Sequence, residues 1–181
     1  FFHPDGTRVV NYPGDRVLQT MQRRWLNHVK GVFYLGDNHI LSAGIEHQHD
    51  YLKSPYRLER GKASVYTLAS YAQDEWSITN LLNLTLGYRF VHHKEFGQKF
   101  TPKISAKYSL GDFNLRATYS YGFKAPTLKE LYQNYITVIM GPLKAYYGNE
   151  NLKPQSSNYG SASVEYSNGK FQATVTGYYN R

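Results

Sequence analysis

The chain has 181 residues, no cysteine and a formal charge of +8. These values exclude a disulfide framework and a cysteine-ligated metal site. The basic residues are scattered along the sequence, which argues against a nucleic-acid-binding protein, since such proteins gather them into a stripe. Tyrosine is unusually frequent, at 18 residues. The sequence contains no run of about 18 apolar residues that would predict a transmembrane helix.

Eight segments predict β-strands, because apolar and polar residues alternate along them with period two. In chain order they are residues 23–35, 39–49, 65–76, 81–90, 103–110, 113–122, 158–167 and 171–179. The apolar faces often end in Tyr, Phe or Trp, for example at Tyr88–Phe90 and Trp76. Such rings are typical of strands that cross a membrane–water boundary.

The links between these segments alternate in length. The short links contain Gly, Asn or Asp, which adopt the backbone angles of hairpin turns. The short links are residues 35–38, 77–80, 110–112 and 167–170, and the longer links are at about 51–64, 93–100 and 123–157. This alternation is typical of barrels that have short periplasmic turns and long extracellular loops.

The sequence therefore predicts an all-β, antiparallel up-and-down transmembrane β-barrel, present only as a segment of about eight strands. A soluble β-sandwich or a lipocalin-like barrel is the alternative, since both have alternating strands. The chain opens on a loop-like stretch, and Arg181 falls inside a predicted strand. We therefore expect residues 1–181 to be part of a longer polypeptide, without a signal peptide.

Four motifs, in order, resemble those of TonB-dependent outer-membrane receptors. Phe123-Lys124-Ala125-Pro126, followed by Thr-Leu-Lys-Glu-Leu-Tyr, resembles the Phe-Arg-Ala-Pro box of that family. Residues 148–154 are similar to its Asn-Pro-Asn/Asp-Leu box with a trailing Lys-Pro. Residues 66–79 resemble its Tyr-Ala-Gln-Asp-Glu-Trp strand, and residues 82–93 resemble the strand that follows it.

The resemblance implies a role in transport across the outer membrane of a Gram-negative bacterium. Family members are plugged barrels of about 22 strands that import iron–siderophore complexes, haem or cobalamin with energy supplied through TonB. Residues 1–181 would then be a partial barrel without the plug domain or the segment that contacts TonB. A haem or ferric siderophore importer is the first hypothesis. A cobalamin importer and a porin or adhesin barrel outside the TonB system are the alternatives.

The link 123–157 is the candidate ligand-binding region, because a large nutrient must be bound outside the cell before it enters the lumen. Aromatic rings offer flat contacts, and polar groups orient the ligand. The candidate ligand-binding residues are Phe123, Lys124, Tyr132, Tyr135, Tyr146, Tyr147 and Asn149, and Lys129 and Lys144 add positive charge. The alternative is that these tyrosines pack the loop against itself. Pro126 ends strand pairing, and Thr127 with Glu130 predicts a capping box on a short helix.

In the family that this chain resembles, haem receptors usually carry a histidine between the two boxes. Residues 127–148 contain no histidine. Tyr135, Tyr146, Tyr147 and Met140 are the remaining candidate iron ligands in that region. The candidate metal ligands elsewhere are His47, His49, His92 and His93, and ordinary rim or lumen positions are the alternative for them. We expect no permanently bound cofactor. No nucleophile–base arrangement is visible, so the sequence gives no indication of an enzyme.

Overall fold

The computed structural model describes residues 10, 12–138 and 141–181. In these ranges the chain forms ten strands and one short helix. The strands are β1 (Met21–Leu35), β2 (His39–Lys53), β3 (Lys62–Ser77), β4 (Leu82–His93), β5 (Gly97–Leu110), β6 (Phe113–Lys124), β7 (Asn134–Val138), β8 (Leu143–Tyr147), β9 (Gln155–Ser167) and β10 (Gln172–Asn180). The helix α1 spans Leu128–Tyr132, and no helix in the described ranges is long and apolar enough to cross a membrane.

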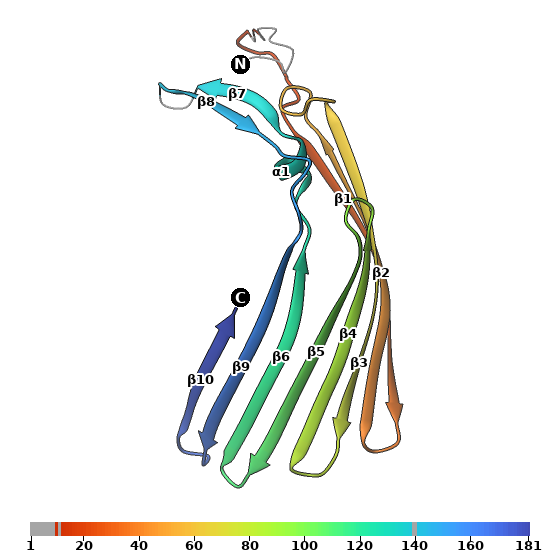
Figure 1. Cartoon of the computed structure of the whole chain (residues 1–181), viewed down its shortest axis with the longest axis vertical. Coiled ribbons are helices and arrows are strands. Elements are labelled where there is room, and N and C mark those ends of the chain that lie inside the picture. Colours follow the sequence, from red (N-terminus) through yellow and green to blue (C-terminus); the bar gives the residue numbers. More distant parts are fainter. Residues whose placement is uncertain (1–9, 11, 139–140) are drawn as a thin grey trace.

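Eight of the strands form a single antiparallel sheet in the order β1-β2-β3-β4-β5-β6-β9-β10. The sheet is a curved wall with the tight turns at one end and the longer connections at the other (Figure 1). β1 and β10 are its two edges, so the described strands form an open part of a barrel wall. This arrangement confirms the predicted up-and-down antiparallel topology.

Side chains on the two faces of the sheet differ as the alternation predicts. The strand pairing runs without a break in register, so directly opposed residues share a face from β1 to β10. On the outward face, Ile45, Ile104 and Val175 are 60%, 44% and 76% exposed. Large apolar side chains in such positions are suited to lipid, and those on the inward face are mostly polar.

Two of the predicted links are different in the structure. The predicted link 93–100 is only a three-residue turn, since β4 ends at His93 and β5 begins at Gly97. Gly97 has a φ of +67°, which allows the chain to reverse tightly at that point. The long link does exist, but it is not irregular: β7 and β8 pair as a separate hairpin inside it. We call residues 125–154, which connect β6 to β9, the excursion.

The main packed core lies between the excursion and the inner face of β2 and β3. Leu52, Leu58, Val65 and Leu128 form a buried cluster, with Ala63 and Tyr132 packed against it. The predicted capping box is confirmed: the Thr127 hydroxyl accepts a hydrogen bond from the Glu130 amide, and the Glu130 carboxylate accepts one from the Thr127 amide. The cap starts α1 immediately after Pro126, which orients Leu128 toward the inner face of β2 and β3. The excursion is thereby anchored across the inner side of the wall.

Candidate ligand-binding site

A cavity of about 480 Å³ lies between the inner face of β1–β4 and the chain segment that joins β6 to α1. Residues from both sides line it, and Leu128 of α1 packs against Leu52 of β2 and Val65 of β3 at its edge. Its polar lining on the wall side consists of Gln22, Arg24, Glu46, Gln48, Asp50, Thr67, Arg89 and His93. The opposite side contributes Phe123 of β6 and Thr127 and Lys129 of the excursion, among others.

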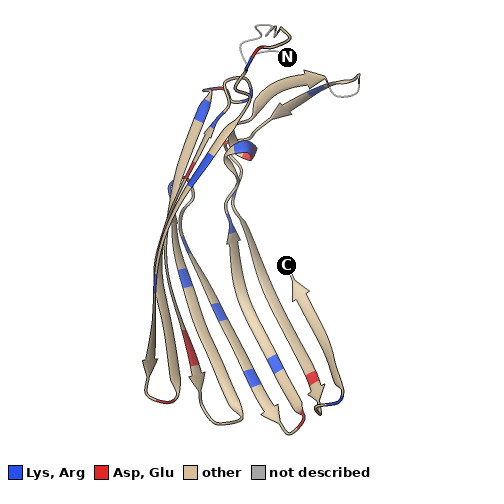
Figure 2. Cartoon of the chain, turned by 180° about the vertical axis from the view of Figure 1, so that it is seen from behind, with Lys and Arg blue, Asp and Glu red and all other residues tan. Residues whose placement is uncertain are grey.

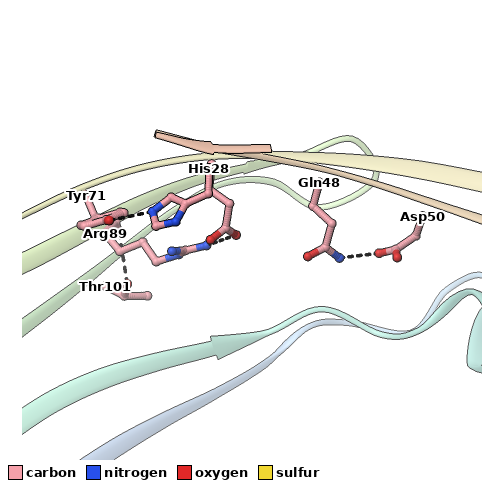
Figure 3. A network of polar contacts seen from close by, with 7 residues as sticks. His28, Gln48, Asp50, Tyr71, Arg89 and Thr101 are labelled. Atoms are coloured by element: carbon pink, nitrogen blue, oxygen red, sulfur yellow. Dashed lines mark hydrogen bonds and ion pairs between the residues drawn. The ribbon is translucent and has the colours of Figure 1, made fainter. Parts of the chain in front are cut away.

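Ion pairs fix most of the charged groups in this cavity. Arg24 Nε donates a hydrogen bond to Asp50 Oδ1 at 2.7 Å, and Gln48 donates to the other oxygen of the same carboxylate. Arg89 Nη2 donates to Glu46 Oε1 at 2.6 Å. Figure 3 shows Gln48, Asp50 and Arg89 on the inner wall, facing the strands on the far side of the concave surface. The cavity therefore has a mixed polar and apolar lining, with most of its charges held in defined places.

A second polar contact lies next to the pair of Arg89 and Glu46, further from the excursion. His28 Nε2 and the Tyr71 hydroxyl are 2.7 Å apart, although β2 separates their two strands (Figure 3). The Thr101 hydroxyl donates to the Arg89 carbonyl oxygen at 3.1 Å. These contacts connect β1, β3, β4 and β5 across the inner face, and they stiffen the wall next to the cavity.

The β7–β8 hairpin presents an aromatic stack above the wall. The rings of Tyr135 and Tyr146 are directly paired across the hairpin, with centroids 4.9 Å apart and an angle of 10° between their planes. The guanidinium carbon of Arg57 lies 5.2 Å from the centre of the Tyr135 ring. The Asn134 amide donates to the Arg57 carbonyl oxygen at 2.8 Å, so the loop between β2 and β3 holds the base of the hairpin.

The other predicted ligand-binding residues lie in different places. Phe123 lines the cavity, whereas Lys124 lines a separate hollow of about 130 Å³. Tyr132 packs at the buried cluster, and burial, followed by the charges of Glu95 and Glu150, raises the pKa of its hydroxyl. Tyr132 packs the excursion against the wall and also lines a hollow next to the cluster, and a ligand-binding role for it stays a prediction.

Tyr147 and Asn149 are also separate from the stack. The Tyr147 side chain is 70% exposed at the end of β8. The Asn149 side chain accepts a hydrogen bond from the Asn151 amide, and the Asn149 amide donates to the Glu130 carbonyl oxygen. Asn149 thus shapes the turn that returns the chain toward β9. Of the seven predicted residues, only Tyr135 and Tyr146 contact one another directly in the described interactions.

Comparison with known proteins gives the family. Residues 3–181 match a family profile described as "TonB dependent receptor-like, beta-barrel". The chain belongs to this family. It is 32% identical over 147 residues to the iron-regulated outer membrane virulence protein of Vibrio cholerae serotype O1, which covers 78% of this chain and 22% of that protein.

Other similar proteins agree with the family assignment. The chain is 29% identical over 138 residues to the ferrienterobactin receptor of Escherichia coli strain K12, covering 71% of this chain and 17% of that receptor. The siderophore receptor PirA from Pseudomonas aeruginosa has the same fold, with a TM-score of 0.82 at 24% identity, covering 89% of this chain and 32% of that one. The chain spans about a fifth of the length of the curated relatives. As a member of this receptor family, the protein is located in the outer membrane of a Gram-negative bacterium.

The histidines of this receptor chain are divided between the two faces of the sheet. His47 and His49 share the outward face of β2 and not the lumen side, whereas His92 and His93 are adjacent on β4 and point to opposite faces. His93 is buried, and its Nδ1 accepts a hydrogen bond from the Glu95 amide at 3.2 Å. No group of three or more His, Cys, Asp or Glu suited to a metal ion occurs among the described residues. Met140 lies outside the described residues.

Sequence reasoning missed the receptor's inner-wall residues, which are Arg24, Glu46, Gln48, Asp50, Arg57 and Arg89. Five of these residues occupy inward positions of strands. Alternation alone places them on the water-exposed face, but it does not show that they contact one another. Glu46 and Arg89 are 43 positions apart, and β3 lies between their strands. The register is needed to find this pair. The available signal was the concentration of strand carboxylates at inward positions of β2.

Proposed function

We propose that this chain forms part of an outer-membrane importer that binds a ferric siderophore at the excursion and the cavity beneath it. The stack of Tyr135 and Tyr146 with the Arg57 guanidinium is the observation that carries this proposal. A ferric catecholate offers flat aromatic rings and negative charge around the iron. Stacked rings and a guanidinium are suited to both features.

The cavity at the start of the excursion supports a path inward. Arg24, Arg89 and Lys129 place positive charge on its lining, although Asp50 and Glu46 balance the first two. A ligand released from the hairpin would meet charged and polar groups on the inner wall, beside the apolar side chains of Leu52, Val65 and Val91. We propose that residues 1–181 are a partial barrel and that other parts of the receptor supply the plug and the segment that receives energy from TonB.

Similarity to siderophore receptors favours a siderophore over haem and over cobalamin. The relatives described above include a ferrienterobactin receptor and a siderophore receptor. Haem binding would need a protein ligand to the iron, and residues 127–148 contain no histidine. The proposed role is binding and transport, with no chemical reaction on the ligand and no permanently bound cofactor.

Uptake of radioactive iron tests the proposal in a host strain that lacks the gene and carries it back on a plasmid. Ferric enterobactin, haem and cobalamin are offered separately to cells with the intact gene product. We expect ferric catecholate uptake to depend on the gene and to fall at least tenfold in a Tyr135→Ala/Tyr146→Ala variant. Tyr34→Ala is the control, because Tyr34 is exposed near the short-turn end of β1. Gene-dependent uptake of haem or cobalamin alone would contradict the proposal.

A further inference from the structure

A carboxylate faces outward near the short-turn end of the wall. Asp74 of β3 lies between Leu41 of β2 and Leu86 of β4, on the face that carries the exposed apolar side chains. Figure 2 shows that acidic residues, in red, are few along the strands, with a red stretch near the short-turn end. The other carboxylates in strands of this sheet occupy inward positions, and they belong to Glu46, Asp50, Glu75 and Glu165. A charge on the lipid-facing side of a barrel costs free energy, so Asp74 needs partners.

Two rings accompany this carboxylate. His39 Nδ1 and Asp74 Oδ2 are 2.8 Å apart, and the histidine is the donor because an ionised carboxylate only accepts hydrogen bonds. The rings of His39 and Trp76 are directly opposed in the register, with centroids 5.3 Å apart and an angle of 18° between their planes. We call His39, Asp74 and Trp76 the Asp74 cluster.

One oxygen of the Asp74 carboxylate has no partner. In the part of the chain that the structure describes, Asp74 Oδ1 is the only buried side-chain oxygen or nitrogen that lacks a hydrogen-bond partner. The side chain as a whole is 30% exposed, and the torsion about its Cβ–Cγ bond is soft, so that a small rotation presents the carboxylate to a donor. Beside a neutral His39 ring the carboxylate keeps its full charge. A cation that donates hydrogen bonds would satisfy both the charge and the free acceptor.

The described part of the chain has no such cation near the cluster. In β1 to β4, the basic residues at outward positions lie at the opposite end of the strands, and they are Arg23, Lys53 and Lys62. The two short turns beside the cluster, residues 36–38 and 78–81, contain no Lys or Arg. A further strand paired to the edge of β1 would lie about 14 Å from β3, given the spacing between strands. The cation therefore has to come from the surroundings of the wall.

Those surroundings are the headgroups of the periplasmic leaflet. His39 is the first residue of β2, and Trp76 is the last residue but one of β3. The Ser77 amide donates to the Asn38 carbonyl oxygen at 2.7 Å, which ties the two strand ends together. Short turns of outer-membrane barrels face the periplasm, and a Trp ring near a strand end marks the boundary between hydrocarbon and headgroups.

We infer that the Asp74 cluster binds the ammonium group of a phosphatidylethanolamine molecule in the periplasmic leaflet. A primary ammonium has three N–H donors: the Asp74 carboxylate accepts from it, and the free Nε2 of His39 is a second acceptor. The face of Trp76, which is 37% exposed, attracts the same positive charge. Phosphatidylcholine has the charge without the N–H donors, and phosphatidylglycerol has neither. The inference depends on the outer-membrane location and not on which nutrient the receptor carries.

The test offers the intact gene product, in detergent, an equimolar mixture of phosphatidylethanolamine, phosphatidylcholine and phosphatidylglycerol with identical acyl chains. Native mass spectrometry then counts the lipids that stay bound. We expect phosphatidylethanolamine to be preferred, and Asp74→Asn to lower its preference over phosphatidylcholine about tenfold, because Asn keeps the shape and loses the charge. Trp76→Leu should lower the binding of phosphatidylethanolamine about threefold. Glu75→Gln is the matched control, since it removes a carboxylate from the inward face of the same strand, and it should keep the wild-type preference.

Four results would overturn the inference. The first is an unchanged preference in Asp74→Asn, and the second is an equal loss in Glu75→Gln, which would show an effect of net charge only. The third is equal retention of phosphatidylcholine by the wild type, which would show that N–H donors are not recognised. The fourth is a protein that copurifies with the wild type and is lost with Asp74→Asn, which would assign the cluster to a protein partner. The unfolding temperature without added lipid checks that each variant is folded.

Discussion

Tyr71 lies across Gly44 to reach His28. A Cβ atom at Gly44 would be 2.6 Å from the Tyr71 hydroxyl oxygen and 2.7 Å from the Val29 carbonyl oxygen. The Tyr71 side chain therefore passes directly over the backbone of β2 on its way from β3 to β1. The absence of a side chain at Gly44 permits the hydrogen bond between Tyr71 and His28.

Gly44→Ala should destabilise the receptor by about 1–3 kcal/mol, since the extra methyl group overpacks a fixed ring. Gly160→Ala is the matched control, because no atom lies within 4 Å of a Cβ atom built there. Urea unfolding in detergent measures the free energies. The double variant Gly44→Ala/Tyr71→Ala should lose less than the sum of the two single variants. Additive losses would show that the ring does not limit position 44.

Arg89→Ala should lower the free energy of unfolding by about 1 kcal/mol, because it leaves the partly exposed Glu46 carboxylate without its partner. The difference in the free energy of unfolding between the wild type and Arg89→Ala should shrink at high salt, because salt screens the charges in both. Lys103→Ala is the control, since Lys103 has no ion pair among the described residues. An identical loss in this control would assign the effect to side-chain packing in general.

Hydrogen bonds from Thr127 lower the pKa of the Glu130 carboxyl group below its ordinary value of 4.5. A lowered pKa means that the cap contributes its full stability above pH 4.5 and loses it as the pH falls through the folded-state pKa. Hydrogen exchange at the Leu131 amide, corrected for intrinsic rates, should therefore increase in acid. Glu130→Gln should remove this dependence. Glu59→Gln, in the loop between β2 and β3, should leave it intact.

Leu58→Ala should release the excursion from the wall, because Leu58 is 2% exposed in the cluster that anchors α1. The expected cost is about 2–5 kcal/mol, and it falls on the docked excursion more than on the sheet. Limited proteolysis should cut residues 125–154 faster, while the sheet's unfolding temperature changes little. Leu152→Ala, at an exposed position, is the control. Equal cleavage of both variants would show that the cluster does not hold the excursion.

The sheet could be predicted from sequence because each strand carries its own alternation. Residues 81–90 show which side chains face lipid without reference to any other strand, and the Thr127-to-Glu130 spacing similarly predicts the cap. The extent of β4 and β5 could not be predicted, because His92, His93 and Lys99 are polar as a loop is, although strands of a barrel extend past the lipid. Strand length beyond the membrane depends on neighbouring strands.

The candidate site was predictable only in part. Tyr135 and Tyr146 were found because rings in a long link are uncommon, but their stacking depends on the β7–β8 hairpin. A signal for that hairpin existed in the apolar and β-branched run at 135–138 and the Gly141-Pro142 turn. Arg57 comes from a different loop, and its position over Tyr135 depends on packing around Leu58. Such contacts are decided by tertiary structure.

The anchoring of α1 has a mechanical consequence. The excursion leaves the wall at β6 and returns at β9, yet it is fastened to β2 and β3, so it works as a strut that spans the concavity. Force applied to the hairpin by a captured ligand would pass into the β2–β3 connection through Arg57 and Leu58. A change in the curvature of the wall would therefore be coupled to a change in the orientation of the β7–β8 hairpin, and the reverse.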